Sequence, residues 1–390
     1  MHIAIIVGSF LPVPAVIGGA VEKVHILLAG AYRAAGHEVT IISRRYRDLP
    51  AEEVVDGIRH IRIPSVDRCR WLAANLVWDL IYALRAAVAL PSADVTITNS
   101  VFPPLVLPRR KAGRIYVQLG RYPKYQVLLY WRADRLQAVS RAVADGITRQ
   151  APWLARKVGV IGYAIPDAYF RPAALPSRGK TVLFVGRIAR EKGVELLVKA
   201  FASMQQGAGI DGWSLRIVGP HEISQGGDGA EYLNRLQRLA DALGAHCSFV
   251  GPVFDQAALL REYQAAAIFV YPSLAESGEA LGLAPLEAMA AGCAVVVSNL
   301  RCFDDYVEDG TSGLKFDHRS DDPSASLAAQ LARLMAEPGL LQHIAEGGHR
   351  AASGFQTAAI AARMLDDFAA LCADRPVRGY DDVAASRRIP

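Results

Sequence analysis

The sequence predicts an α/β protein built from two doubly wound parallel sheets. Short runs rich in Val and Ile alternate with helical patterns along the whole chain, and the pattern restarts after residues 171–180. The composition is that of a globular protein, with 52% hydrophobic and 21% charged residues. Short apolar runs bounded by Gly or Pro are typical of strands buried on both faces. Their alternation with helices indicates right-handed βαβ units.

In the first half, apolar runs predict four strands and one amphipathic helix. The first strand is followed by paired glycines and then by the helix, as in a βαβ unit. The predicted strands are residues 2–7, 39–43, 95–98 and 114–118, and the predicted helix is residues 20–35.

The most apolar window, residues 71–91, predicts a helix that does not span a membrane. Asn75, Asp79 and Arg85 interrupt it. A charge at the middle of a span costs ~2.5–3.5 kcal/mol even on a mild insertion scale. Two alternatives stay open: the helix packs on protein, or it lies on a membrane surface.

The segment 171–180, RPAALPSRGK, has two prolines, a glycine and no apolar period, which predicts a domain boundary. We expect an N-terminal domain at 1–172, a C-terminal domain at 173–355, and a helix at 356–390 that crosses back before a tail. We expect a ligand cleft between the domains, outside the carboxyl ends of the strands. The second half predicts strands at 182–185, 215–218, 248–250, 267–271 and 294–298, and helices at 194–204, 230–243 and 286–291.

Charge is unevenly distributed between the halves. Residues 1–172 hold 23 Lys and Arg against 12 Asp and Glu, whereas the remainder holds 20 against 26. A basic half indicates an anionic partner, either membrane headgroups, phosphates or nucleic acid. Nucleic acid is disfavoured because the cations are dispersed and no binding motif accompanies them. The five cysteines form no CxxC pair, which favours free thiols in a reducing compartment.

The segment 271–299 has the strongest chemical signal. A strand ends at Pro272, and a loop then carries Glu276 and Glu279. Pro285 predicts a helix start, with Glu287 in the first turn. A helix N-terminus favours an anion such as phosphate, and Glu287 there would accept hydrogen bonds from ribose hydroxyls. The alternative is that Glu287 is only a favourable acid of the first helical turn and that Glu279 is a solvated loop residue.

Two further loops follow predicted strands. FVGRIAREKG, residues 184–193, carries Arg187, Arg190 and Lys192 before a helix, which suits a diphosphate. The alternative is a solvated basic turn. IGGAVEK, residues 17–23, allows close backbone approach through Gly18 and Gly19. It is not GxGxxG, so a dinucleotide site is disfavoured.

Together these motifs resemble the retaining glycosyltransferases of family 4, which have the GT-B fold of two facing Rossmann-like domains. The resemblance extends from Met1 to about Leu371 and includes GHEVTII, GLAPLEAMAAG and DYVEDGTSGLKF. It implies that Arg187 and Lys192 grip the donor diphosphate, Glu287 binds the ribose and Glu279 binds hydroxyls of the donor sugar. The resemblance also implies that Gly18, Gly19, Ala280, Leu281, Gly282 and Leu283 bind substrate. We further expect substrate contacts at predicted strand ends from Asn99, Gln118, Gly219 and Val250.

The chain departs from the family at two places. Gln118 and Leu119 stand where a His often lies, and Ala280 replaces a usual Pro. The leaving phosphate is widely held to take the acceptor proton in retaining transfer, so the activity survives loss of the His in principle.

The resemblance implies a metal-independent enzyme without a cofactor. It would move a sugar from a UDP- or GDP-linked donor to a hydroxyl of a glycan or lipid-linked acceptor, in bacterial surface polysaccharide or glycolipid synthesis. No Asp-x-Asp triplet occurs in the sequence. We expect a cytoplasmic protein, peripheral on the inner membrane, because residues 68–85 and 121–132 mix cations with aromatic residues. The alternatives are a non-catalytic sugar-nucleotide-binding or membrane-docking subunit and a sugar-nucleotide epimerase.

Overall fold

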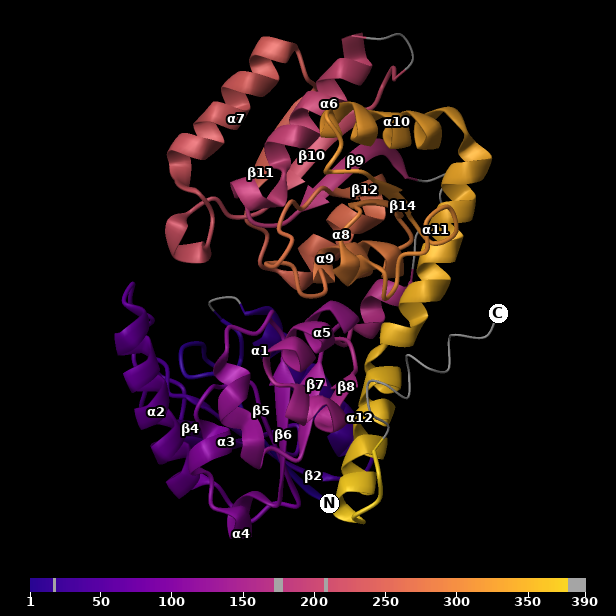
Figure 1. Ribbon diagram of the computed structural model, residues 1–390. Coiled ribbons are helices and arrows are strands. Elements are labelled where there is room, and N and C mark those ends of the chain that lie inside the picture. The colour runs from indigo at the N-terminus through magenta and orange to yellow at the C-terminus, as the bar shows by residue number, and fades with distance from the viewer. Residues whose placement is uncertain (17–18, 172–177, 207–209, 378–390) are drawn as a thin grey trace. The chain divides into compact units, whose positions relative to one another are not determined.

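The computed structural model describes residues 1–16, 19–171, 178–206 and 210–377. The chain forms two compact units. The N-terminal unit comprises Met1–Ala164 together with Thr357–Pro390, and the C-terminal unit comprises Ile165–Gln356. Both are parallel α/β layers, which confirms the predicted fold class (Figure 1).

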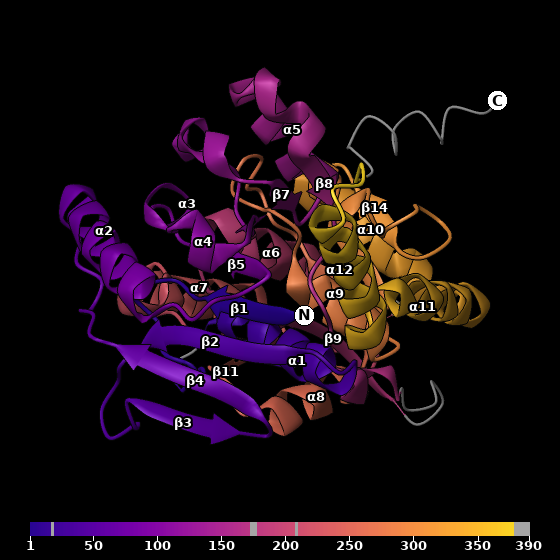
Figure 2. The same cartoon turned by 90° about the horizontal axis from the view of Figure 1, so that it is seen from below.

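The N-terminal unit is built on an eight-stranded sheet of order β3-β4-β2-β1-β5-β6-β7-β8. Among the strands that the structure describes in this unit, only the β3–β4 pair is antiparallel, and it forms the outer edge (Figure 2). The strands are β1 (His2–Ile6), β2 (Glu38–Arg44), β3 (Glu52–Val55), β4 (Ile58–Ile63), β5 (Val95–Thr98), β6 (Arg114–Leu119), β7 (Arg135–Ala138) and β8 (Val158–Val160). The helices are α1 (Ala20–Ala34), α2 (Leu72–Ala89), α3 (Pro103–Val106), α4 (Arg109–Ala112), α5 (Arg141–Gln150) and α12 (Thr357–Cys372), with 3-10 turns η1 (Gln126–Arg132) and η2 (Pro152–Lys157).

The C-terminal unit is built on a six-stranded parallel sheet of order β11-β10-β9-β12-β13-β14. The strands are β9 (Gly179–Val185), β10 (Ser214–Val218), β11 (Cys247–Gly251), β12 (Ala266–Tyr271), β13 (Ala294–Ser298) and β14 (Leu314–Phe316). The helices are α6 (Val194–Gln206), α7 (Gly229–Leu243), α8 (Gln256–Ala265), α9 (Leu283–Ala290), α10 (Pro323–Ala336) and α11 (Pro338–Ala352). Its 3-10 turns are η3 (Asp167–Phe170), η5 (Arg190–Lys192), η6 (Ile223–Gln225), η7 (Arg301–Phe303) and η8 (Ser353–Phe355).

The strand order of each sheet reverses beside its first strand. In the N-terminal sheet β1 lies between β2 and β5, and in the C-terminal sheet β9 lies between β10 and β12. Residues of these central strands are buried, because helices cover both faces. Doubly wound sheets bind ligands at such reversal points, outside the carboxyl ends of the strands. A ligand site is therefore expected at the loops after β1, β5, β9 and β12.

The two units divide before the predicted boundary at residue 172. The Ile165 backbone N–H donates to the Phe355 carbonyl at 2.8 Å, and this contact places Ile165 with the C-terminal unit. The last helix, α12, packs on α1 and β6 of the N-terminal unit (Figure 1). The ring of Phe368 on α12 lies between those of Tyr32 and Tyr116, at centroid distances of 5.7 and 5.0 Å.

Helix α2 is fastened to the N-terminal unit by a buried carboxylate. Asp79 accepts hydrogen bonds from the hydroxyls of Ser9 and Ser100, at 2.8 and 2.5 Å. It also accepts from the backbone N–H groups of Val101 and Phe102, at 3.1 and 3.2 Å. Ser9 follows β1 and the other donors follow β5, so one side chain joins α2 to both strand ends.

Replacing Asp79 by Ala should lower the free energy of unfolding of this unit by about 2–4 kcal/mol, because four donors lose their acceptor inside the protein. Urea denaturation followed by circular dichroism measures the change. Asp366→Ala is the matched control, because Asp366 lies on α12 with its side chain exposed. Equal stability of the two variants would contradict the role given to Asp79.

Candidate functional site

The loop after β9 presents the predicted diphosphate-binding cations. Arg187 lies two residues beyond the strand and donates to the Gly226 carbonyl at 2.6 Å and to the Glu191 carboxylate at 2.7 Å. Its side chain remains partly exposed. Lys192 ends the short turn η5 and is buried. Gly193 then adopts a left-handed φ of 68°, and a Cβ there would lie 2.0 Å from the Pro272 carbonyl oxygen.

The loop after β12 meets this first loop through a buried ion pair. The Lys192 ammonium lies 2.5 Å from the Glu279 carboxylate, and both side chains are almost fully buried. The Ser273 hydroxyl also donates to Glu279, at 3.1 Å. Lys192 lies 5.3 Å from the centre of the Tyr271 ring. The structure therefore brings Lys192 and Glu279 together at the reversal point of the sheet.

Helix α9 begins at Leu283, so Pro285 is its third residue. The predicted placement of Glu287 in the first turn is wrong; it lies in the second turn. Gly282 caps the helix with a φ of 74°, and a Cβ at Gly282 would lie 2.7 Å from the Phe303 ring. Ala280 and Leu281 precede this cap, so the predicted run Ala280–Leu283 is the entry to α9.

The carboxylate of Glu287 is oriented by Tyr263 from α8. The Tyr263 hydroxyl donates to Glu287 at 2.9 Å. Burial, together with the Glu287 charge, raises the pKa of Tyr263 well above its usual value, so the hydroxyl stays protonated. Tyr263 carries no sequence signal of this role, because it lies in an ordinary helix 24 residues before Glu287.

Three other residues of this unit were singled out in the sequence: Gly219, Val250 and Glu276. Gly219 follows β10, and a Cβ there would lie 1.8 Å from the Gly186 carbonyl, so glycine is needed for the two strand ends to approach. Val250 in β11 is partly exposed. The other loop acid, Glu276, pairs with His318 at 2.9 Å and with Arg319 at 2.7 Å, and lies outside the buried Lys192–Glu279 pair.

In the N-terminal unit, Gly19 caps α1 with a φ of 118°. A Cβ at this position would lie 2.2 Å from the Glu22 carboxylate. Glu22 is buried, and burial raises its pKa although the Arg121 charge opposes the shift. Gly18 lies outside the described residues. Glu22 is part of the GGAVEK motif, but the motif gave no sign that this acid is buried.

Asn99 and Gln118 lie at the carboxyl ends of β5 and β6. Gln118 is 2% exposed, and among the residues described neither of its amide atoms has a hydrogen-bond partner. The buried Asn99 Oδ1 and the Tyr163 hydroxyl are likewise unpartnered within the described residues. The Tyr163 hydroxyl lies against Gly120, where a Cβ would approach it to 1.6 Å. Buried polar atoms without a hydrogen-bond partner are rare in proteins. Asn99, Gln118 and Tyr163 lie at or after the ends of β5, β6 and β8, at the carboxyl edge of the sheet.

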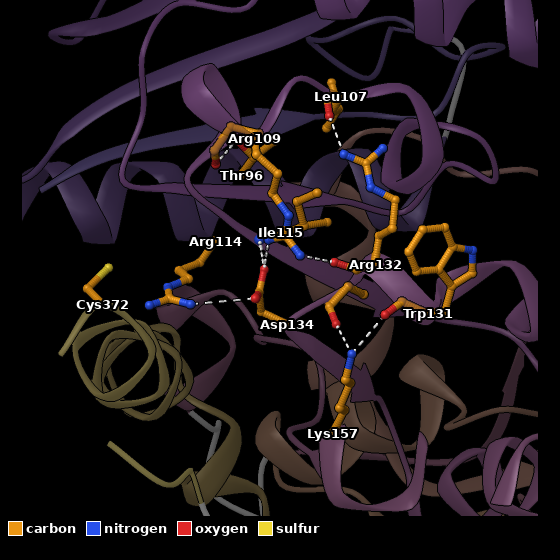
Figure 3. Close-up of polar contacts among 12 residues, drawn as sticks. Thr96, Leu107, Arg109, Arg114, Ile115, Trp131, Arg132, Asp134, Lys157 and Cys372 are labelled. Carbon is orange, nitrogen blue, oxygen red and sulfur yellow. Dashed lines mark hydrogen bonds and ion pairs between the residues drawn. The ribbon is translucent and has the colours of Figure 1, made fainter. Parts of the chain in front are cut away.

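A polar pocket of about 630 Å³ lies at the opposite edge of the same sheet. Arg109, Arg114 and Asp134 line it, beside the first residues of β6 and β7 (Figure 3). Asp134 accepts hydrogen bonds from Arg109 and from the Ile115 N–H, the latter at 2.7 Å. The pocket lies at the amino ends of the strands, whereas doubly wound sheets bind their ligands outside the carboxyl ends, so it does not resemble a substrate site.

Comparisons with known proteins agree with this geometry. Residues 167–351 match the family model described as glycosyl transferases group 1. The chain is 31% identical over 262 residues to a D-inositol 3-phosphate glycosyltransferase of Streptomyces bingchenggensis, covering 64% of this chain and 54% of that one. It is 27% identical over 385 residues to a phosphatidyl-myo-inositol mannosyltransferase of Mycobacterium tuberculosis, covering 92% and 95%. The chain thus spans only about half the length of the first of these relatives.

Solved structures show the same fold. A sucrose-phosphate synthase from Thermosynechococcus elongatus superposes with a TM-score of 0.77 at 24% identity, covering 96% of this chain and all of that one. HepE of Anabaena, solved in complex with UDP-glucose, superposes with a TM-score of 0.70 at 17% identity, covering 95% and 100%. At these identities the likeness concerns the fold alone.

Replacing Lys192 by Met should lower the free energy of unfolding of the C-terminal unit by about 3–5 kcal/mol, because a buried carboxylate loses its counter-charge. The double variant Lys192→Met/Glu279→Leu should recover most of that loss, since neither charge then remains buried. Urea denaturation of the wild type, both single variants and the double variant gives the coupling energy. Additive effects would show that the two side chains do not interact.

Proposed function

We propose that this chain is a group 1 glycosyltransferase, which transfers a sugar from a nucleoside diphosphate donor to an acceptor hydroxyl with retention of the anomeric configuration. The match of residues 167–351 to that family model and the GT-B fold support the proposal. The observation that carries the proposal is the convergence of Lys192, Glu279 and the start of α9 at the carboxyl ends of β9 and β12. These groups match the parts of a UDP- or GDP-sugar: cations for the diphosphate, carboxylates for hydroxyls.

In the proposed arrangement, the donor diphosphate meets Arg187, Lys192 and the N–H groups at the start of α9. Positive groups held in place before the reaction stabilise the charge that develops as the diphosphate leaves. Arg187 is held in place by hydrogen bonds to Glu191 and the Gly226 carbonyl, which reduces the reorganisation it needs. The leaving phosphate takes the acceptor proton, so no side-chain base is required at Gln118.

The two glutamates have separate roles in this proposal. Glu287, oriented by Tyr263, binds the ribose hydroxyls. Glu279, held by Lys192 and Ser273, accepts from hydroxyls of the donor sugar. A carboxylate has about four lone-pair sites, so accepting from two protein donors leaves room for a substrate hydroxyl.

The N-terminal unit supplies the acceptor side of the proposal. Gly19 lies after β1 and Asn99 after β5, and Gln118 lies in β6 with an amide that has no partner among the described residues. Gly18, outside the described residues, belongs to the proposal by sequence alone. An acceptor hydroxyl would satisfy such buried polar atoms. The relatives named for inositol glycosyl transfer and phosphatidylinositol mannosyl transfer support an acceptor that is a polyol, a glycan or lipid-linked. We place the activity in bacterial surface polysaccharide or glycolipid synthesis, at the cytoplasmic face of the membrane.

Release of nucleoside diphosphate tests the activity. The protein should bind either UDP or GDP, and a nucleotide at 100 times its dissociation constant should stabilise it by ~2.7 kcal/mol in a thermal-shift panel. Incubation with the matching sugar nucleotides and a lipid extract should release that diphosphate.

Saturating EDTA should leave turnover within about twofold, because the sequence offers no Asp-x-Asp ligand set. Loss of turnover restored by Mg²⁺ would contradict the metal-independent step.

The second candidate function is a non-catalytic subunit that binds a sugar nucleotide. The replacement of the family His by Gln118 and Leu119 favours it. Nucleotide stabilisation without release of diphosphate, under any donor and acceptor tried, would support this alternative over transfer.

Glu287→Gln should weaken nucleotide binding by about 1.5–3 kcal/mol, because a charged hydrogen-bond acceptor of the ribose is lost. Glu279→Gln should reduce kcat by about 10²–10³, because a charged acceptor of the donor sugar is lost. It should weaken nucleotide binding less than Glu287→Gln does, because Glu279 reaches the diphosphate only through Lys192. Calorimetry with the free nucleotide and turnover with the full donor separate the two effects. The reverse pattern would exchange the roles, and urea denaturation identifies any variant that is merely unfolded.

A further inference from the structure

Helix α2 has its apolar residues on the outside. Its buried stripe consists of Asn75, Asp79, Tyr82, Ala83 and Ala86. The exposed face includes Leu72, Val77 and Val88, which are 72%, 56% and 80% exposed. Trp71, Leu76, Trp78, Leu80 and Leu84 are exposed on the same segment. A surface helix ordinarily has the opposite arrangement, so this face indicates a contact with an apolar medium.

The polar side chains of α2 are engaged on the inner side. Asp79 receives four hydrogen bonds from the segments after β1 and β5. The Asn75 side chain bonds the backbone N–H and carbonyl of Cys69, at 3.0 and 2.7 Å. Of the charged residues of α2 only Arg85 is exposed. The exposed residues of α2 therefore include no acid and are mostly apolar.

A second exposed apolar segment lies near α2. Tyr125, Leu128, Leu129 and Trp131, in and beside η1, are exposed. Helix α3 contacts both α2 and η1, so the two segments are neighbours in the same unit.

The end of η1 is anchored by cations. The Lys157 ammonium donates to the carbonyls of Trp131 and Ala133, at 2.9 and 2.7 Å, and Arg132 donates to the Leu107 carbonyl at 3.2 Å (Figure 3). The exposed Trp131 side chain is thus carried by a turn whose backbone is held by these hydrogen bonds.

Cations border both apolar segments. Arg68 and Arg70 precede α2, and Arg121 and Lys124 precede η1, all with exposed side chains. An apolar face bordered by cations and aromatic rings is complementary to an anionic bilayer, where apolar groups enter the acyl boundary and cations meet phosphates. The whole half of the chain is basic as well.

We propose that α2 lies in the plane of an anionic bilayer, with η1 as a second point of contact. By length and composition α2 is also able to span a membrane, with 28% of its window buried. Spanning would break the four hydrogen bonds of Asp79 and place that carboxylate in hydrocarbon. Docking in the plane keeps them. The inference deepens the proposed function, since it names the surface on which a lipid-linked acceptor is met.

The experiment is co-sedimentation of the full chain with vesicles, without a donor. Vesicles of phosphatidylcholine containing phosphatidylglycerol should retain the protein, pure phosphatidylcholine should not, and high salt should release it. The triple variant Leu72→Gln/Val77→Gln/Val88→Gln should lower the partition coefficient by about tenfold or more, because three apolar side chains no longer enter the bilayer. Val54→Gln is the matched control, because Val54 is 69% exposed on the edge strand β3.

Several outcomes overturn the proposal. One is a wild type that stays in the supernatant with both vesicle types at low salt, and another is a triple variant that binds like the wild type. Protein that resists extraction by salt and alkali would show a spanning helix. A soluble dimer that the triple variant converts to a monomer, without vesicle binding, would assign the face to a second copy of this chain.

Circular dichroism checks that the triple variant is folded. Quenching of tryptophan fluorescence by lipid measures insertion into the bilayer without any change to α2. In Trp131→Phe/Trp153→Phe the remaining tryptophans are Trp71 and Trp78 at the docking face and the buried Trp213. Brominated anionic lipid should quench Trp71 and Trp78, and absent quenching overturns the proposal. Nucleotide binding and release are measured without vesicles, so failure of docking and failure of the proposed function are distinguishable.

Discussion

The candidate donor site depends on one buried ion pair, that of Lys192 with Glu279. It fastens the loop after β9 to the loop after β12, which leave neighbouring strands in the same direction. The backbone strengthens this junction: the Leu274 N–H donates to the Glu191 carbonyl at 2.7 Å, and Gly193 lets the chain pass the Pro272 carbonyl. Two buried charges carry a desolvation cost that only close geometry offsets. The pair therefore contributes more to the position of the two loops than to stability.

The sequence was sufficient for the parts of this site that lie close together along the chain. The strands β9 and β12 follow from their apolar runs, and Glu279 and Glu287 from their place around a helix start. The register of α9 was not predictable, because Pro is compatible with any position of the first turn. The roles of Tyr263 and Ser273 were not predictable, because a side chain orients a glutamate only if the fold brings the two residues together.

The same limit explains the N-terminal unit. Strand β7, with the sequence RLQA, lacks the Val- and Ile-rich run by which other strands were predicted, and its Arg135 Nε donates to Asp367 at 3.0 Å, 232 residues further along the chain. For α2, periodicity left two alternatives because Trp71, Trp78 and Tyr82 all suit a core or a membrane. The structure separates them: Tyr82 is buried, whereas both tryptophans are exposed. The deciding residue was Asp79, whose four partners lie on segments remote from the helix in sequence.

The return of α12 to the first sheet affects the order in which the protein is completed during translation. The C-terminal unit is one uninterrupted stretch, Ile165–Gln356, and all of its residues have been synthesised before α12 is made. The N-terminal unit begins the chain but lacks Phe368, which lies between Tyr32 and Tyr116, until the last helix emerges from the ribosome. Domains usually fold in the order of their synthesis. Here the half that is synthesised first is the half that closes its core last.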